Sequence, residues 1–243
     1  MIRGLAALLA LFGAVAVPAG ALECRDVEFE GQRYTTSEVD PAADDLRTFL
    51  ADGAGRTLGS FSAVEAAAGR PLLFAMNAGM YHADRAPVGL YVEDGQEVMR
   101  VVTSAGPGNF GLLPNGVLCL ADGAARVIES RAFAARPPAC RFATQSGPML
   151  VIDGALHPRF LPASDSLNIR NGAGVAPDGR PVLAISNEPV NFHQFGRLFQ
   201  EALGVRDALY FDGSISRLYD SGSGRHDGGW PMGPMIGTVK EAG

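Results

Sequence analysis

The chain has 243 residues, a formal net charge of −6 and 47% hydrophobic residues. That length suits one domain with a sizeable core, or at most two small domains. The mild acidity and the lack of a Lys/Arg cluster argue against a nucleic-acid partner, because phosphate backbones are bound by concentrated positive charge.

The N-terminus has the pattern of a secretory signal peptide. Arg3 precedes an unbroken apolar run over residues 5–17, and residues 18–21 supply the small residues that a signal peptidase reads. Cleavage after Ala21 would leave residues 22–243 and move the charge to −7, because Arg3 is the only charged residue removed. The run is shorter than the ~20 apolar residues of a membrane span, so no stable membrane insertion is expected. The predicted location is periplasmic or secreted.

Three cysteines in an oxidising compartment predict one disulfide and one leftover thiol. Cys119 and Cys140 are the better pair, because they flank a stretch rich in Ala, Arg and Pro, and their bridge would contribute ~3 kcal/mol. Three unpaired buried thiols are the alternative. Glu23 stands where a lipobox needs a small residue, which argues against lipidation of Cys24.

Helix signals occur in three places along the chain. The first two helices are expected from Asp40 to Leu50 and from Ser60 to Ala68. The third follows Asn191, a good N-cap, carries an apolar face over residues 192–203 and ends at Gly204. This face must pack onto a sheet.

Short apolar runs bounded by turn residues predict strands over residues 71–76, 88–93, 98–102, 116–120, 126–128, 148–152, 172–176, 181–186 and 207–211. Hairpin turns are indicated by Asp94-Gly95, Asp122-Gly123, Asp153-Gly154 and Asp178-Gly179, which supply positive φ angles. No repeat and no linker appears. We therefore expect a single-domain α+β fold, with a mixed, largely antiparallel sheet and a few covering helices.

Several predicted strands run into polar residues, and such ends are where a rigid scaffold presents functional groups. Asn77 follows the apolar residues 72–75, although an Asn that bonds its own turn is the alternative. The runs over 106–110 and 114–116 are better explained as turns. Gln145 and Ser146 precede a strand and suit a sugar or phosphate contact. No nucleophile elbow or catalytic triad is apparent.

Arg170 opens a strand whose other members are small or apolar. It is either an ion-pair partner or an anion clamp, and we favour the clamp because the planar guanidinium fits phosphate oxygens. The strand over 181–186 leads into a polar run that contains Asn187 and Glu188 and ends at Asn191, which already caps the helix.

Asp212 ends the apolar run 208–211 and is followed by Gly213. This order aims a carboxylate out of a sheet edge into a space kept open by small groups. A plain Asp-Gly turn is the alternative. It is weakened because Ser214, Ser216 and Arg217 are polar where a hairpin strand would resume apolar alternation.

The four histidines show no metal-ligand spacing, so zinc is not expected. Oxygen-only calcium sites stay open, although no calcium-loop motif appears. We expect no cofactor.

Taken in order, these segments resemble the phosphodiester glycosidase (NAGPA-type) domain family, specifically its bacterial branch once grouped as a domain of unknown function, DUF2233. The resemblance spans about residues 70–220 and rests on the runs 76–81, 88–91, 109–110, 145–150, 170–172, 189–192 and 209–216. It implies hydrolysis of a sugar-1-phosphodiester, as in the lysosomal enzyme that removes N-acetylglucosamine from a mannose-6-phosphate diester. The site residues that it implies are Asn77, Gln145, Ser146, Arg170, Asn187 and Asp212.

The sequence departs from the family at two of these runs. Eukaryotic members carry Asn-Gly-Gly-Phe-Phe where this chain has residues 77–81, and Asp-Gly-Gly-Gly-Ser-Ser where it has residues 212–217. The resemblance therefore implies the reaction class and leaves the identity of the sugar open.

A phosphodiester changes what a glycosidase needs. Most glycosidases use two carboxylates, but a phosphate monoester with a second pKa of ~6 leaves as an anion, so a cation can replace the general acid. We expect Asp212 to act at the anomeric carbon as nucleophile or water-activating base and Arg170 to neutralise phosphate, with Glu188 as reserve acid. The expected substrate-binding residues are Asn77, Gln145, Ser146, Asn187, Asn191 and Ser214.

Two rival functions stay open. One is a non-catalytic protein that binds glycans or assists exopolysaccharide assembly through the same cleft. The other is a metal-dependent phosphodiesterase. The expected partner of the hydrolase is a carbohydrate or glycosyl-phosphate substrate.

Overall fold

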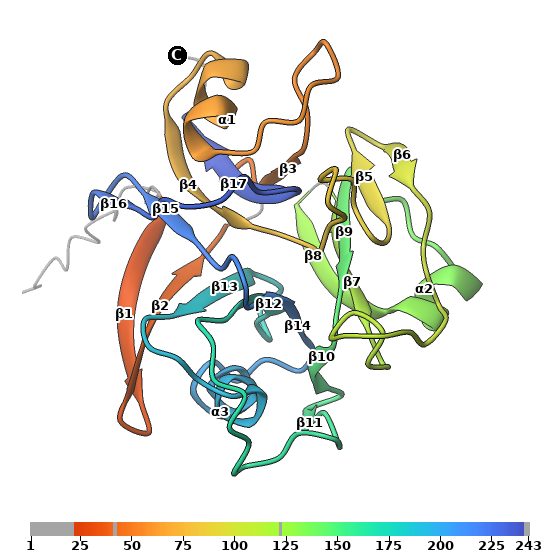
Figure 1. The fold of residues 1–243 in the computed structure, drawn as a ribbon, viewed down its shortest axis with the longest axis vertical. Helices are drawn as coiled ribbons and strands as arrows, with labels where there is room; N and C mark the ends of the chain where they lie inside the picture. The colour runs from red at the N-terminus through yellow and green to blue at the C-terminus, as the bar shows by residue number, and fades with distance from the viewer. Residues whose placement is uncertain (1–21, 41–42, 122, 241–243) are drawn as a thin grey trace, which may run out of the picture.

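A computed structural model describes residues 22–40, 43–121 and 123–240. Its strands form three sheets, and every strand pair in them is antiparallel (Figure 1). The largest sheet has the order β1 (Glu23–Phe29), β2 (Gln32–Glu38), β13 (Pro181–Ser186), β12 (Asn171–Val175), β14 (Ala208–Asp212), β10 (Met149–Ile152) and β11 (Ala155–Leu156).

The other two sheets have five strands each. The second has the order β16 (Arg225–His226), β15 (Leu218–Asp220), β4 (Leu72–Asn77), β17 (Met235–Val239) and β3 (Arg47–Phe49). The third has the order β6 (Gln96–Met99), β5 (Tyr91–Glu93), β9 (Phe142–Ser146), β7 (Gly116–Ala121) and β8 (Ala124–Glu129). The helices are α1 (Phe61–Ala68), α2 (Ser130–Ala135) and α3 (Phe192–Arg197), which continues as the π-helical segment η1 (Leu198–Ala202).

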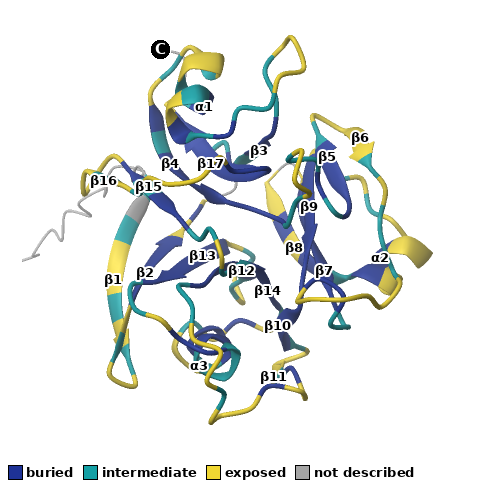
Figure 2. Ribbon diagram, in the orientation of Figure 1, coloured by how far each residue is buried: buried dark blue, intermediate teal, exposed yellow. Residues whose placement is uncertain are grey.

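All three sheets contribute to one central core, and a helix covers the outer face of each (Figure 1). In β14, Leu209 and Phe211 face the central core, whereas Ala208 and Tyr210 pack with α3. Because successive side chains of a strand point to opposite faces, a strand buried on both faces is a continuous apolar run. Figure 2 shows these central strands as buried.

The predicted fold class is confirmed: the domain is α+β with antiparallel sheets and few helices. Asn191 caps α3 in a capping box with Gln194, and Gly204 has the left-handed φ of 62° that ends this helical segment.

The predicted Asp-Gly turns form with one difference. Asp94-Gly95 and Asp153-Gly154 have positive φ angles and connect β5 to β6 and β10 to β11. Gly123 has the same conformation between β7 and β8, while Asp122 lies outside the described residues. In the longer connection from β12 to β13, Gly179 has a positive φ and Asp178 does not.

The helix expected from Asp40 to Leu50 is wrong. Residues 47–49 form β3, which pairs with β17, and residues 41–42 lie outside the described part of the chain. Leu46, Phe49 and Leu50 have helical spacing, but hydrogen bonding to β17 overrides this local preference. The sequence interpretation also missed several strands, including β1 and β2, because their polar residues hide the period of a strand.

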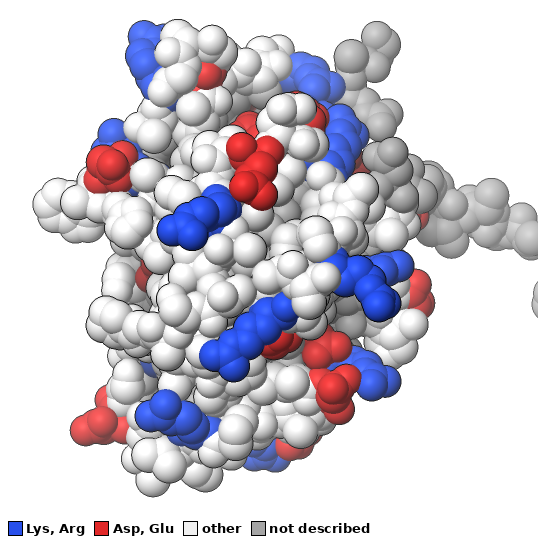
Figure 3. Space-filling view, turned by 90° about the vertical axis from the view of Figure 1, so that its right-hand side faces the viewer, with Lys and Arg blue, Asp and Glu red and all other residues white. Residues whose placement is uncertain are grey.

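Cys119 and Cys140 form a disulfide with a Cα–Cα distance of 5.4 Å, and Cys24 is a free, half-buried thiol. Burial raises the pKa of Cys24 to about 12. Within the described residues, no helix has the length and apolarity needed to span a bilayer. On the face in Figure 3, positive and negative side chains are interspersed. The predicted signal peptide, residues 1–21, lies outside the described residues.

Candidate active site

The cleft lies where the first two sheets meet, around the loop over residues 213–217. This loop leaves β14 of the seven-stranded sheet and enters β15 of the neighbouring sheet. Asp212 is the last residue of β14, so the rigid end of a central strand positions its carboxylate. The expectation that Asp212 lies at a sheet edge beside a polar loop agrees with this placement.

A pair of buried amides fixes the base of the loop. Asn77 of β4 and Asn171 of β12 exchange side-chain hydrogen bonds of 3.1 and 3.2 Å. Asn171 Oδ1 also accepts from the backbone N–H of Asp212 and from Ser216 Oγ, and Asn77 Oδ1 accepts from the backbone N–H of Arg217. The pair therefore joins two sheets and holds both ends of the loop.

The Asp212 carboxylate is half-buried, and backbone N–H groups stabilise part of its negative charge. Its Oδ1 accepts hydrogen bonds from the backbone N–H groups of Gly213 (2.6 Å) and Ser214 (2.7 Å). Burial raises the pKa of Asp212 above its ordinary value, and the backbone amides of residues 213–215 oppose the shift. Gly213 and Ser214 both donate to Oδ1, so the loop that follows β14 holds the carboxylate in place.

Two cavities meet at this loop, and both are lined by Ser214 and Ile215. One cavity, here called the aspartate cavity, has a volume of about 400 Å³ and is lined by Met80, Tyr81, Val88, Asn109, Asp212, Ser214 and Ile215. The other, here called the arginine cavity, has about 640 Å³, and its polar lining comes from Ser186, Asn187, Ser214, Ser216, Arg217, Arg225 and Asp227. Their volumes are in the range of small-molecule sites.

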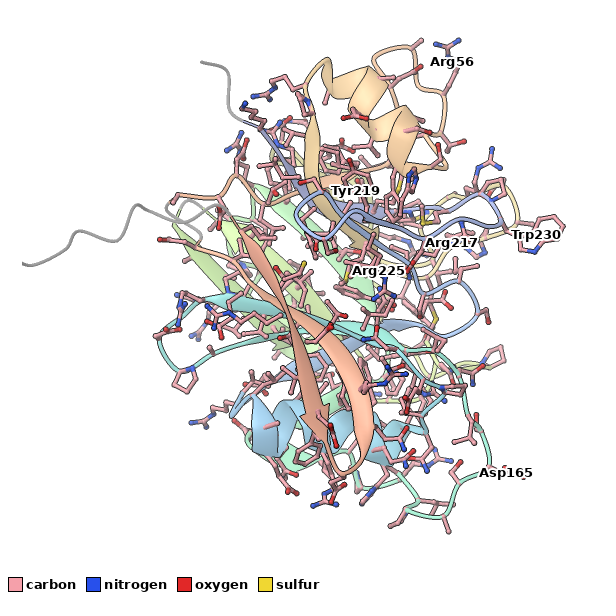
Figure 4. The ribbon with its side chains drawn as sticks, turned by 90° about the vertical axis from the view of Figure 1, so that its left-hand side faces the viewer. Arg56, Asp165, Arg217, Tyr219, Arg225 and Trp230 are labelled. Atoms are coloured by element: carbon pink, nitrogen blue, oxygen red, sulfur yellow. A yellow bond between two sulfur atoms is a disulfide. The ribbon has the colours of Figure 1, made fainter. Side chains whose placement is uncertain are left out.

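The two arginines of the arginine cavity differ in their partners. Arg225 pairs with Asp227 at 2.9 Å and donates to Asn187 Oδ1 at 2.8 Å. Arg217 donates instead to the neutral backbone carbonyl of Trp230, and no described carboxylate forms an ion pair with it. Arg217 is therefore the cation whose charge is less neutralised, and Figure 4 shows both arginines on this side of the molecule.

Arg170, the expected phosphate clamp, lies beneath the loop and does not line either cavity. It is 1% exposed, donates to the carbonyls of Val190 and Ser166 and to the Tyr210 hydroxyl, and lies 3.8 Å from the centre of the Phe192 ring. Burial lowers the pKa of its guanidinium. In this conformation a ligand in the cleft cannot reach Arg170, so its role is to support the loop.

Gly213 shows how closely this support fits. A Cβ atom at residue 213 would lie 2.3 Å from the Tyr210 hydroxyl and 3.5 Å from Arg170 Nη1. The glycine therefore allows the loop to pack against Tyr210. The sequence suggested instead that a small residue at this position leaves open space for a ligand.

Three other expected substrate-binding residues are buried and fully engaged with the protein. Gln145 Oε1 accepts from the backbone N–H groups of Leu90 and Val102, and its Nε2 donates to the carbonyl of Val102 and to Ser130 Oγ. Ser146 Oγ donates to the carbonyl of Phe211. Asn191 caps α3 and donates to the carbonyls of Pro162 and Ser164 in the connection from β11 to β12. None of them lines a described cavity of the cleft, and buried Asn77 likewise serves the loop.

The remaining expected residues divide between cleft and surface. Asn187 and Ser214 line the arginine cavity. Glu188, the reserve acid, pairs with Arg33 at 2.8 Å and lines neither cavity. Among the described residues, no three His, Cys, Asp or Glu side chains gather as metal ligands.

Sequence reasoning missed several cleft residues: Tyr81, Asn109, Arg217 as a cation, Arg225 and Asp227. Tyr81 and Asn109 belong to runs that carry the family resemblance, and that was the available signal. Arg225 and Asp227 follow the last of these runs and had no signal in the sequence.

The family model of the phosphodiester glycosidases (NAGPA) matches residues 71–237, which include Asn77, Asp212 and the loop over residues 213–217. The chain belongs to this family. It is also 33% identical, over 96% of its length and 90% of the relative's, to the uncharacterised protein YigE of Escherichia coli K12.

Solved structures share the fold of this family member. The catalytic domain of zebrafish N-acetylglucosamine-1-phosphodiester alpha-N-acetylglucosaminidase, auto-inhibited by its pro-peptide, superposes with a TM-score of 0.62 at 13% identity, covering 91% of this chain and 83% of that one. A hypothetical protein from Synechocystis has a TM-score of 0.59 at 14% identity and covers 90% of this chain and 62% of that one. At these identities the likeness concerns the fold.

Proposed function

We propose that the protein is an exported hydrolase that cleaves a sugar-1-phosphodiester in a glycan or envelope polymer, with Asp212 acting at the anomeric carbon. The single observation that carries the proposal is the Asp212 carboxylate, half-buried at the end of β14, with a raised pKa and an adjoining cavity that holds Arg217. Family membership supplies the reaction class.

The reaction adds water across the bond between the anomeric carbon and the phosphate oxygen. In one route Asp212 attacks the anomeric carbon and water then hydrolyses the glycosyl ester; in the other Asp212 takes a proton from the attacking water. In either route the C–O bond electrons go to the departing phosphate monoester. The carboxylate must be ionised to act, so activity falls as the pH falls through its raised pKa.

The departing phosphate would meet Arg217 in the arginine cavity. Arg217 replaces Arg170 in this role because it lines the cavity and has a neutral carbonyl as its described partner. The charge of Arg225 is largely neutralised by its ion pair with Asp227. Arg225 also donates to Asn187, which lines the same cavity. Cationic stabilisation of the developing negative charge reduces the need for a general acid.

The decisive experiment compares Asp212→Asn with the wild type on a panel of α- and β-linked sugar-1-phosphodiesters, following release of the phosphate monoester. We expect turnover to fall by about 10²- to 10⁴-fold, the usual contribution of a positioned acid or base. Asp165→Asn is the matched control, because it makes the same chemical change on an exposed loop (Figure 4). Full activity of Asp212→Asn would remove Asp212 from the mechanism.

The rival functions give other results in the same assay. Glycan binding without product from any diester would favour a binding or assembly role. Activity that a chelator removes and a divalent ion restores would favour a metal-dependent phosphodiesterase.

Export is the second part of the proposal. It is supported by the signal-peptide pattern over residues 1–21 and by the Cys119–Cys140 disulfide, since disulfides persist in oxidising compartments. N-terminal sequencing of the protein from a periplasmic or culture fraction should begin at Leu22. Recovery of an intact Met1 from the cytoplasmic fraction would overturn it.

A further inference from the structure

The loop between β16 and β17 carries the most exposed of the large hydrophobic side chains that the structure describes. Trp230 is 81% exposed, and it is the only tryptophan in the sequence. Leaving so large an apolar surface in water forgoes the stabilisation that burial would give. Residues 228–231 are all exposed, whereas the residues from Met232 to Val239 are buried, so Trp230 lies in a short exposed stretch directly before a buried one.

This loop is attached to the cleft through the backbone carbonyls of Trp230 and of the residue that follows it. Arg217, from the arginine cavity, donates a hydrogen bond to the carbonyl of Trp230. Tyr81, from the aspartate cavity, donates to the carbonyl of Pro231 at 3.0 Å. One residue of each cavity therefore holds the backbone that bears the exposed ring.

Two glycines allow the backbone of this loop to pack closely against Arg217 and Tyr81. A Cβ atom on Gly229 would lie 2.3 Å from Arg217 Nη2, and residue 229 also has a φ of +141°. A Cβ atom on Gly233 would lie 2.5 Å from the Tyr81 ring. The loop is thus packed directly onto cleft residues, and the backbone of Trp230 is fixed while its ring projects outward (Figure 4).

A fixed aromatic ring beside a polar cleft matches the surface of a sugar. The cavities offer hydroxyl, amide and charged groups, which suit the hydroxyls and the phosphate of a glycosyl phosphate. A pyranose also has an apolar face of C–H groups, and the electron-rich face of an indole ring attracts their partial positive charge. Because the backbone of Trp230 is already held, ordering it on binding costs little entropy.

We propose that Trp230 stacks on a pyranose ring that lies beyond the cleaved bond, so that the substrate is a glycan chain and not only a small diester. The location of the cleaved bond rests on the proposed function. The stacking of a sugar on Trp230 is a binding property, which can be measured without turnover.

The single tryptophan makes the test direct, because all tryptophan fluorescence of the protein reports on Trp230. Asp212→Asn protein is titrated with maltohexaose, cellohexaose, chitohexaose and mannohexaose. We expect at least one of these neutral hexasaccharides to change the fluorescence at millimolar concentration. Binding of that sugar is then measured by calorimetry in variants of residue 230.

We expect Trp230→Phe to bind within a few-fold of the parent, because it keeps an aromatic face. Trp230→Leu and Trp230→Ala should raise the Kd about tenfold, in line with the energy of an aromatic contact. Val98→Ala is the control, since Val98 is a second exposed apolar residue, 56% exposed, on β6 of the third sheet.

Three results would overturn the stacking. These are no fluorescence response to any of the four hexasaccharides, an unchanged Kd in Trp230→Ala, or a response to phospholipid vesicles and not to sugars. Hydrolysis of diesters without a sugar response at Trp230 would reject stacking and keep the hydrolase. A sugar response without hydrolysis of any diester would keep stacking and reject the hydrolase.

Discussion

The buried polar residues Asn77, Gln145, Ser146 and Asn171 contrast with the cleft residues Asp212, Ser214 and Arg217. Both groups lie at strand ends or in the short loop that joins β14 to β15, and they look alike in the sequence. The buried group forms its hydrogen bonds with the backbone and side chains of neighbouring segments of the protein. The cleft group lines cavities. A polar residue at a strand end therefore indicates either a site or the support of a site, and the two are distinguished by whether the side chain lines a cavity.

The largest effect on stability is expected for Gln145→Ala. It removes the partner of two backbone N–H groups and of Ser130 Oγ in a buried position. We expect the free energy of unfolding to fall by about 4 kcal/mol, because each buried group left unpaired costs 1–3 kcal/mol.

Urea denaturation measures this loss, and Ser214→Ala is the comparison from the cleft. Its side chain is exposed, so the expected change is within about 0.5 kcal/mol. Equal losses for the two variants would contradict the division into support and cleft.

The Asn77–Asn171 pair should show an intermediate effect that reaches the cleft. Each Asn→Ala change is expected to cost about 2 kcal/mol, and the double variant should cost less than their sum by about 1–2 kcal/mol because the two amides bond each other. Diester turnover should fall in both single variants, since Asn171 holds the backbone of Asp212. Additive losses in the double-mutant cycle would show that the pair does not act as a unit.

Asp212 should show an effect of opposite sign. Its folded pKa is raised above the ordinary 3.8, so ionisation of the carboxylate costs stability at every pH above the raised value. Asp212→Asn removes this cost and keeps an oxygen for the Gly213 and Ser214 amides. The variant should be more stable than the wild type near neutral pH.

The advantage should shrink as the pH falls through the raised pKa and disappear below about 3.8, where the wild-type carboxyl is protonated in both folded and unfolded states. Denaturation curves of both proteins across this pH range test it. A stability difference independent of pH would show that burial of the charge is not its cause.

The smallest effect is expected for Glu188→Gln. Its ion pair with Arg33 lies at the surface, where solvent screens the attraction, so we expect no measurable change in unfolding. Turnover should also be retained because Glu188 lines neither cavity. A strong loss of turnover in this variant would restore Glu188 as the acid.

Local chemistry was sufficient for part of the fold. The Asn191 cap, the left-handed Gly204 and the turns at residues 94–95 and 153–154 follow from interactions within a few residues, and the structure has all of them. Helical spacing alone was not sufficient at residues 40–50, because pairing with β17 decides that segment. The site divides in the same way: the position of Asp212 at a strand end could be predicted, whereas the cleft arginines could not.

The sequence by itself determined the antiparallel α+β class, the order of the family's runs and the carboxylate at the end of β14. Only the tertiary structure decided that Arg170 and Gln145 face inward and that Arg217, Tyr81 and Trp230 meet at the cleft. The physical reason is the distance along the sequence between the residues that interact. Caps and turns are set by neighbours in the chain, but the burial of a polar side chain depends on strands that lie far away in the sequence, as Asn77 and Arg217 lie 140 residues apart.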